Sequence, residues 1–141
     1  MIIRKALSCD VTDIIELTGQ LGYDVDTDSF RTVLETILKR SDHAVFVADD
    51  NGGVVAYIHV LVKELLITAD TVEIGELIVH EEYHRHGIGR QLVEIAEKWA
   101  GEKGLKKVLV GSSNTRTISH LFYQQIGFCY WKEQKLYTKA L

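Results

Sequence analysis

The segment that most restricts the fold is a largely apolar run over residues 71–79, which leads into a loop with Gly87 and Gly89. An amphipathic pattern starts in this loop, so the sequence predicts a strand, a tight loop and a helix ending near residue 102. N–H groups in the first turn of a helix lack a carbonyl partner and attract anions, which glycine lets approach closely. Arg85 and Arg90 add positive charge to this turn. The segment indicates a phosphate-binding loop, and a plain tight turn is the structural alternative.

Two common phosphate-binding loops do not fit this spacing. A dinucleotide-binding loop needs a third glycine after Gly89, and Leu92 occupies that place. A Walker loop needs Gly-Lys followed by Ser or Thr, and the chain has no such run. The spacing therefore disfavours a nucleotide-binding α/β protein.

Periodicity and turn residues predict the other elements, since the chain contains no Pro. We expect strands at residues 1–7, 44–48, 54–67 and 108–110, and two final strands at 128–131 and 135–138. We expect helices from Ser8 or Asp10 to about residue 21, from Thr27 or Asp28 to about residue 40, and over 117–125. This order predicts an α/β (α+β) fold with a mixed sheet covered by helices on both faces, in a single domain over residues 1–141.

Composition narrows the class of partner and the location. A net charge of −4 argues against a nucleic-acid partner, because phosphate binding needs a basic face. No apolar run is long enough for a membrane span, and the N-terminal residues lack the apolar core of a signal peptide, so we expect no membrane partner and a cytoplasmic protein. Cys9 and Cys129 fit no disulfide framework, and we expect free, partly buried thiols.

Two runs of the sequence resemble the motifs of one family, the GNAT superfamily of acetyl-CoA-dependent N-acetyltransferases. Residues 76–90 resemble its motif A, R/Q-x-x-G-x-G/A after an apolar strand, with His84 in place of the Arg or Gln. Residues 116–128 resemble its pattern R-x-x-A-H-x-F-Y-x-x-x-G-F, and the matches are Arg116, His120, Phe122, Tyr123, Gly127 and Phe128. The resemblance implies a GNAT-like mixed, mostly antiparallel central sheet of about seven strands.

The resemblance also implies acetyl-CoA as co-substrate. Its pyrophosphate is expected on the backbone of the glycine loop, comprising His84, Arg85, His86, Gly87, Ile88, Gly89 and Arg90. The pantetheine arm is expected along Leu77, Ile78 and Val79, next to a bulge or splay near Glu76, with Asn114, Phe122 and Tyr123 as further contacts. A turn residue is the alternative for Asn114 and core packing is the alternative for Phe122, while Tyr123 could merely pack under the cofactor.

Acid–base candidates follow from the chemistry of amine acetylation. A thiolate leaves when an amine attacks a thioester, and the resemblance places the Tyr123 phenol as the general acid that protonates it. Glu73 and Glu76 are candidate bases, on opposite faces of the strand unless a bulge intervenes, and we prefer Glu76. A plain solvated charge is the alternative. His80, His84 and His86 have no nearby carboxylate or Cys cage, so we predict no metal site.

The sequence therefore predicts an N-acetyltransferase that transfers acetyl from acetyl-CoA to a primary amine by direct attack in a ternary complex. The acceptor is expected to be a small-molecule or peptide amine of unknown identity. A non-catalytic acyl-CoA sensor is the alternative. Asp24, Asp26 and Asp28 could attract a cationic amine, or serve only in capping and solubility. The two final strands could pair with a second subunit and form a homodimer.

Overall fold

A five-stranded sheet is the framework of the first of two units into which the chain divides. The computed structural model describes residues 1–141, and the units, Met1–Gly111 and Ser112–Leu141, are described separately. The strands of the first unit are β1 (Ile2–Lys5), β2 (His43–Asp50), β3 (Gly53–Leu65), β4 (Thr68–Val79) and β5 (Lys107–Val110). Its helices are η1 (Ser8–Asp10), α1 (Val11–Gly19), α2 (Thr27–Leu38), η2 (Glu81–Tyr83) and α3 (Ile88–Glu102).

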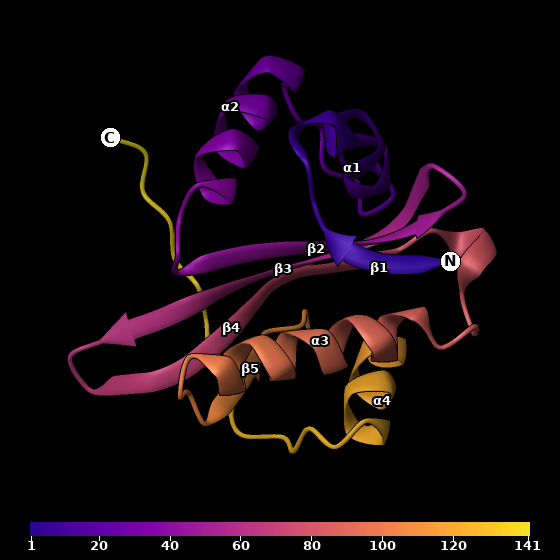
Figure 1. Cartoon of the computed structure of the whole chain (residues 1–141). Coiled ribbons are helices and arrows are strands. Elements are labelled where there is room, and N and C mark those ends of the chain that lie inside the picture. Colours follow the sequence, from indigo (N-terminus) through magenta and orange to yellow (C-terminus); the bar gives the residue numbers. More distant parts are fainter. The chain divides into compact units, whose positions relative to one another are not determined.

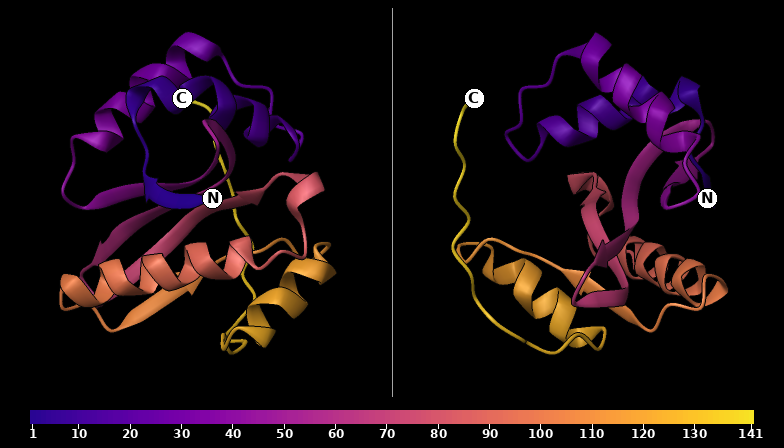
Figure 2. Two further views of the ribbon diagram at one scale, coloured as in Figure 1. Left: turned by 45° about the vertical axis from the view of Figure 1, so that its right-hand side comes forward. Right: turned by 90° about the vertical axis from the view of Figure 1, so that its left-hand side faces the viewer.

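The sheet is mixed and its strands lie in chain order. β1 to β4 pair antiparallel in succession, and β5 adds to β4 in parallel. α1 and α2 cover one face of the sheet and α3 covers the other (Figures 1 and 2). This confirms the predicted class of fold, a mixed and mostly antiparallel sheet with helices on both faces. The helix predicted to end near residue 102 is also confirmed.

The core has two layers because both faces of the sheet are covered. Every residue of β2 from 44 to 48 is buried, which is the pattern of a strand with helices on either side. The layer under α1 and α2 contains Val45, Val47, Tyr57 and Ile78 from the strands. The layer under α3 is closed from the helix side by Ile88, Leu92, Val93, Ala96, Trp99 and Ala100.

The second unit holds one helix, α4 (Thr117–Gln125), as predicted. The two strands predicted at residues 128–131 and 135–138 are wrong, because residues 126–141 form no regular element. Alternating apolar residues make a strand only when a neighbouring edge accepts the backbone hydrogen bonds, and no such ladder forms here. The side chains of Tyr130, Trp131, Leu136 and Tyr137 are exposed.

Cys9 and Cys129 are free as predicted, but both are exposed rather than partly buried. Among the helices, none combines the length and the apolar character that crossing a membrane would require.

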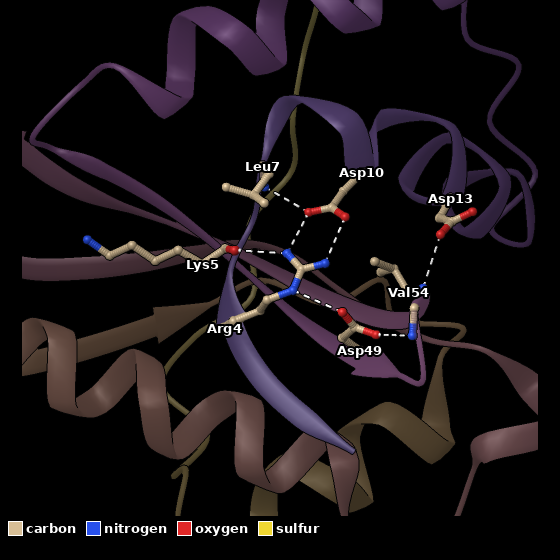
Figure 3. Close-up of polar contacts among 8 residues, drawn as sticks. Arg4, Lys5, Leu7, Asp10, Asp13, Asp49 and Val54 are labelled. Atoms are coloured by element: carbon tan, nitrogen blue, oxygen red, sulfur yellow. Dashed lines mark hydrogen bonds and ion pairs between the residues drawn. The ribbon is translucent and has the colours of Figure 1, made fainter.

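A partly buried ion-pair cluster ties β1 to η1 and to the end of β2 (Figure 3). Two nitrogens of the Arg4 guanidinium donate to the two carboxylate oxygens of Asp10 at 2.8 and 2.9 Å, and Arg4 Nε donates to Asp49 at 3.0 Å. Asp10 also accepts from the Leu7 backbone N–H at 2.7 Å. These bonds hold the pKa of Asp10 below its ordinary value even though its burial opposes this.

We expect Asp10→Asn to lower the free energy of unfolding by about 2 kcal/mol, because a charge-assisted, bidentate contact is lost from a buried position. Because the folded pKa of Asp10 is depressed, its contribution is present above the unfolded pKa and is lost as the pH falls below about 4. Urea unfolding at pH 7 and pH 3 measures both effects. Asp42→Asn in the exposed Arg40–Asp42 pair is the control, and it should change the free energy of unfolding much less because solvent screens that pair. Equal effects of the two substitutions would contradict the structural role of Asp10.

Candidate active site

The loop before α3 presents a row of backbone N–H groups without acceptors. The first amide of this region that finds a carbonyl is that of Gln91, which donates to Gly87 at 3.1 Å. The amides of residues 85–90 donate to no protein group. Arg85 and Gly87 have positive φ angles of 66° and 74°, and this left-handed backbone turns successive amides toward one side. The local geometry is that of an anion-binding site at a helix N-terminus.

Side chains from neighbouring elements hold this loop in place. His84 Nε2 donates to the carbonyl oxygen of Val79, the last residue of β4, at 2.8 Å. The Tyr83 hydroxyl donates to Asp50 at 2.7 Å and so attaches η2 to the end of β2. Space around Gly87 is open, since a side-chain carbon there would meet nothing within 4 Å. Side-chain hydrogen bonds therefore hold the loop against β4 and β2, while the space beside Gly87 is free.

The three histidines of this segment have separate contacts and do not converge. His80 Nδ1 accepts from the Glu82 N–H at 3.2 Å, and His84 bonds to the end of β4. His86 lies edge-on to Tyr83 with ring centroids 6.5 Å apart. No three His, Cys, Asp or Glu side chains gather as metal ligands.

The strand that leads into the loop has an open edge. The parallel ladder between β4 and β5 ends at the pair Ile74–Val110, and no strand pairs with residues 75–79 on that side. On the other side, Leu77, Ile78 and Val79 remain paired with β3. Their backbone groups are therefore available along one edge only. An extended polar chain could bond there as an additional strand does.

A β-bulge in the same strand decides where the two glutamates point. His59 pairs with Glu76 and Val60 pairs with Ile74, so Gly75 is the extra residue of β4. Without it, Glu73 and Glu76 would lie on opposite faces; with it, both lie on the face covered by α1 and α2. Glu73 forms an ion pair with Lys63 on β3 at 3.5 Å.

Glu76 is held by a hydroxyl chain that the sequence analysis missed. The buried Tyr57 hydroxyl contacts the Oε2 atom of Glu76 and lies 2.7 Å from the Thr18 hydroxyl, which is 2.8 Å from the Ile14 carbonyl. Burial and the neighbouring Glu76 raise the pKa of Tyr57. Tyr57 therefore fixes the position of Glu76 from β3, and Thr18 fixes Tyr57 from α1.

His59, which pairs with Glu76 between β3 and β4, stacks on His43. His43 Nδ1 and His59 Nε2 are 2.9 Å apart, and the rings lie 5.2 Å apart between centroids. Burial, followed by the proximity of His43, lowers the pKa of His59. His59 is therefore neutral at pH 7, since its ordinary pKa already lies below that value.

The second unit holds the remaining candidates on and around α4. Tyr123 packs edge-on against Phe122 and Phe128, with ring centroids 5.2 and 5.5 Å away. Burial raises the pKa of the Tyr123 hydroxyl, and Arg116 partly opposes this. Asn114 is exposed in the loop before α4. His120 Nε2 donates to the Ser113 carbonyl at 2.8 Å, which fixes the path of that loop.

Comparisons with known proteins identify the class that these features define. The model of the acetyltransferase (GNAT) family matches residues 11–128. An uncharacterized N-acetyltransferase of Chlorobaculum tepidum is 30% identical over 132 residues, which cover 94% of this chain and 81% of that protein. The chain therefore belongs to the GNAT family, and the prediction of an acetyl-CoA-dependent N-acetyltransferase is confirmed.

Solved structures agree on the fold. An aminoglycoside N-acetyltransferase, AAC(6')-Iy in complex with CoA, superimposes with a TM-score of 0.89 at 21% identity, covering 99% of this chain and 95% of that one. Glucosamine-6-phosphate N-acetyltransferase of Arabidopsis thaliana gives a TM-score of 0.84 at 23% identity, covering 99% and 98%. At this level of identity the likeness concerns the fold alone.

Proposed function

We propose that this chain transfers the acetyl group of acetyl-CoA to the primary amine of a small molecule, by direct attack within a ternary complex. The observation that carries the proposal is the row of unpaired amides at residues 85–90, which follows a strand, β4, whose last residues have an open edge. Family membership supports acetyl-CoA as the co-substrate. Two solved structures of the same fold are named for small-molecule acceptors, an aminoglycoside and glucosamine 6-phosphate, and the acceptor proposed for this chain is of that kind rather than a peptide.

The residues of the loop and strand suit acetyl-CoA. The unpaired amides would bind the pyrophosphate, aided by the charge of Arg85 and Arg90. The free edge at Leu77, Ile78 and Val79 would bond the amides of the pantetheine arm. We propose His84 as a support for this loop through Val79, and Asn114 and Phe122 as further contacts of the arm. Bound acetyl-CoA supplies an activated acetyl group, and no metal is required.

We propose Glu76 as the general base. A C–N bond forms and the C–S bond breaks, the amine proton passes to the Glu76 carboxylate, and the thiolate takes a proton from the Tyr123 hydroxyl. Glu76 is favoured because Tyr57 orients it, whereas Glu73 is engaged by Lys63. Glu73 remains the second candidate. Burial raises the pKa of Tyr123, so its phenol is protonated at neutral pH and holds the proton that the thiolate would take.

Cytoplasmic action is proposed from the two exposed free cysteines, which persist best where thiols stay reduced. A homodimer is proposed from the exposed apolar side chains of residues 128–141, which a second copy could cover.

Titration calorimetry with acetyl-CoA should give micromolar affinity, with no response to ATP or NAD. Gly87→Val should weaken acetyl-CoA binding by about tenfold or more, because a β-branched residue at positive φ displaces the amide row. Gly104→Val is the matched control. Gly104 has a φ of 72° just beyond the C-terminal end of α3. The Gly104→Val variant should therefore lose a similar amount of stability and keep its affinity for acetyl-CoA. Absent binding by the unmodified protein would refute the proposed co-substrate.

Tyr123→Phe and Glu76→Gln should each lower kcat by about 10² or more while acetyl-CoA affinity is kept, because each removes a proton donor or acceptor. Glu73→Gln should keep most of the turnover. In the unmodified enzyme, any alkaline loss of activity caused by Tyr123 should begin above pH 10, since its pKa is raised. Acetyl-CoA binding without turnover on any amine would instead favour an acyl-CoA sensor.

Light scattering after gel filtration should give the mass of a dimer. Tyr137→Asp should shift the population toward monomer, because it puts a charge among the exposed apolar side chains of residues 128–141. Leu66→Asp, at a fully exposed position between β3 and β4, is the control and should leave the mass unchanged. A monomeric unmodified chain at micromolar concentration would exclude the dimer.

A further inference from the structure

A cavity of about 200 Å³ lies between α2 and the sheet face that carries Glu76. Its α2 side is formed by apolar side chains, among them Phe30, Val33 and Ile37, and its sheet side includes Glu76 and His59. All of these residues belong to the first unit. The cavity is thus adjacent to the proposed base, on the face of β4 that the Gly75 bulge selects.

The cavity carries a single charge. Glu76 is its only acidic side chain, and no Lys or Arg lines it. Tyr57 bonds one carboxylate oxygen of Glu76, which leaves Oε1 without a protein partner. His59 is kept neutral by burial and by its contact with His43. One cationic or hydrogen-bonding amine therefore satisfies the polar demand of the cavity.

The acidic residues that a polycation would require lie elsewhere. Asp24, Asp26 and Asp28, in and beside the loop before α2, do not line the cavity. Asp26 instead caps α2 by accepting from the Ser29 N–H at 2.9 Å. A polyhydroxylated or polycationic acceptor would bury several polar groups against apolar walls, which costs binding energy without compensating bonds.

From this geometry we infer the class of acceptor: a primary monoamine whose amino group is carried by a compact apolar body, aromatic or branched aliphatic. This inference rests on the proposed transfer reaction. The cavity sets the size, because an apolar cavity of about 150 Å³ accommodates benzene. A single ring with a short alkylamine arm, as in 2-phenylethylamine, fits with its ring against α2 and its nitrogen at Glu76. This class differs from the acceptors named for the two structural neighbours.

The test compares kcat/KM for 2-phenylethylamine, spermidine, kanamycin and glucosamine 6-phosphate, with acetyl-CoA and the full chain. We expect 2-phenylethylamine to exceed each of the other three by about tenfold or more. Val33→Glu should lower its kcat/KM by about tenfold, because a charge then enters the apolar wall. Val33 is 56% exposed, so the fold should tolerate the change. Thr32→Glu adds the same charge to an exposed neighbouring position outside the cavity and should leave kcat/KM unchanged.

The outcomes separate this inference from the proposed function. Preferred acetylation of spermidine, kanamycin or glucosamine 6-phosphate would overturn the acceptor class and leave the transferase intact. Equal effects of Val33→Glu and Thr32→Glu would also overturn it, since the cavity would then not bind the amine. Acetyl-CoA binding with no amine acetylated would overturn the transferase itself, and the acceptor class with it.

Discussion

The break in β4 is the constraint on which the proposed active site depends. At Gly75 the strand gains a residue relative to β3, and just before it, at Ile74, the strand loses its partner β5. The bulge turns Glu76 toward the face covered by α1 and α2. The lost pairing frees the backbone edge of residues 75–79. One local irregularity thus creates both a position for a base and a template for an extended co-substrate. A regular strand would supply neither.

Rigid elements surround this break and keep it in one geometry. Tyr57 and Thr18 hold Glu76 from the β3 and α1 side, while His84 joins the glycine loop to the last carbonyl of β4. At position 75 a side-chain carbon would come within 3.1 Å of His59, so glycine suits the bulge sterically as well. His84 stands at the motif position that Arg or Gln usually fills in the family, and its ring donates a hydrogen bond to the Val79 carbonyl. The departure at His84 is therefore compatible with an intact loop.

Much of the fold was predictable because its signals are local. Helix periodicity identified α3 and α4, turn residues identified the link between β2 and β3, and the glycine spacing identified the loop. The last two predicted strands failed because pairing is a property of two segments, and residues 128–141 find no edge. The sequence narrowed the candidate base to two residues, Glu73 and Glu76. The supporting residues Tyr57 and Thr18 carried no signal, since a tyrosine in an apolar strand reads as core.

By itself the sequence determined the family, the glycine loop and the residue types available for proton transfer, because these depend on spacing along the chain. Only the tertiary structure decided that both glutamates share one face of the sheet, since that depends on one extra residue in the register between β3 and β4, and that Glu76 is the one that lines the cavity. It also decided the character of the cavity, because α2 brings Phe30, Val33 and Ile37 over Glu76 from far away in the sequence. Spacing along the chain identifies residues that can bind phosphate or transfer protons, while the packing of distant segments determines which side chains surround them.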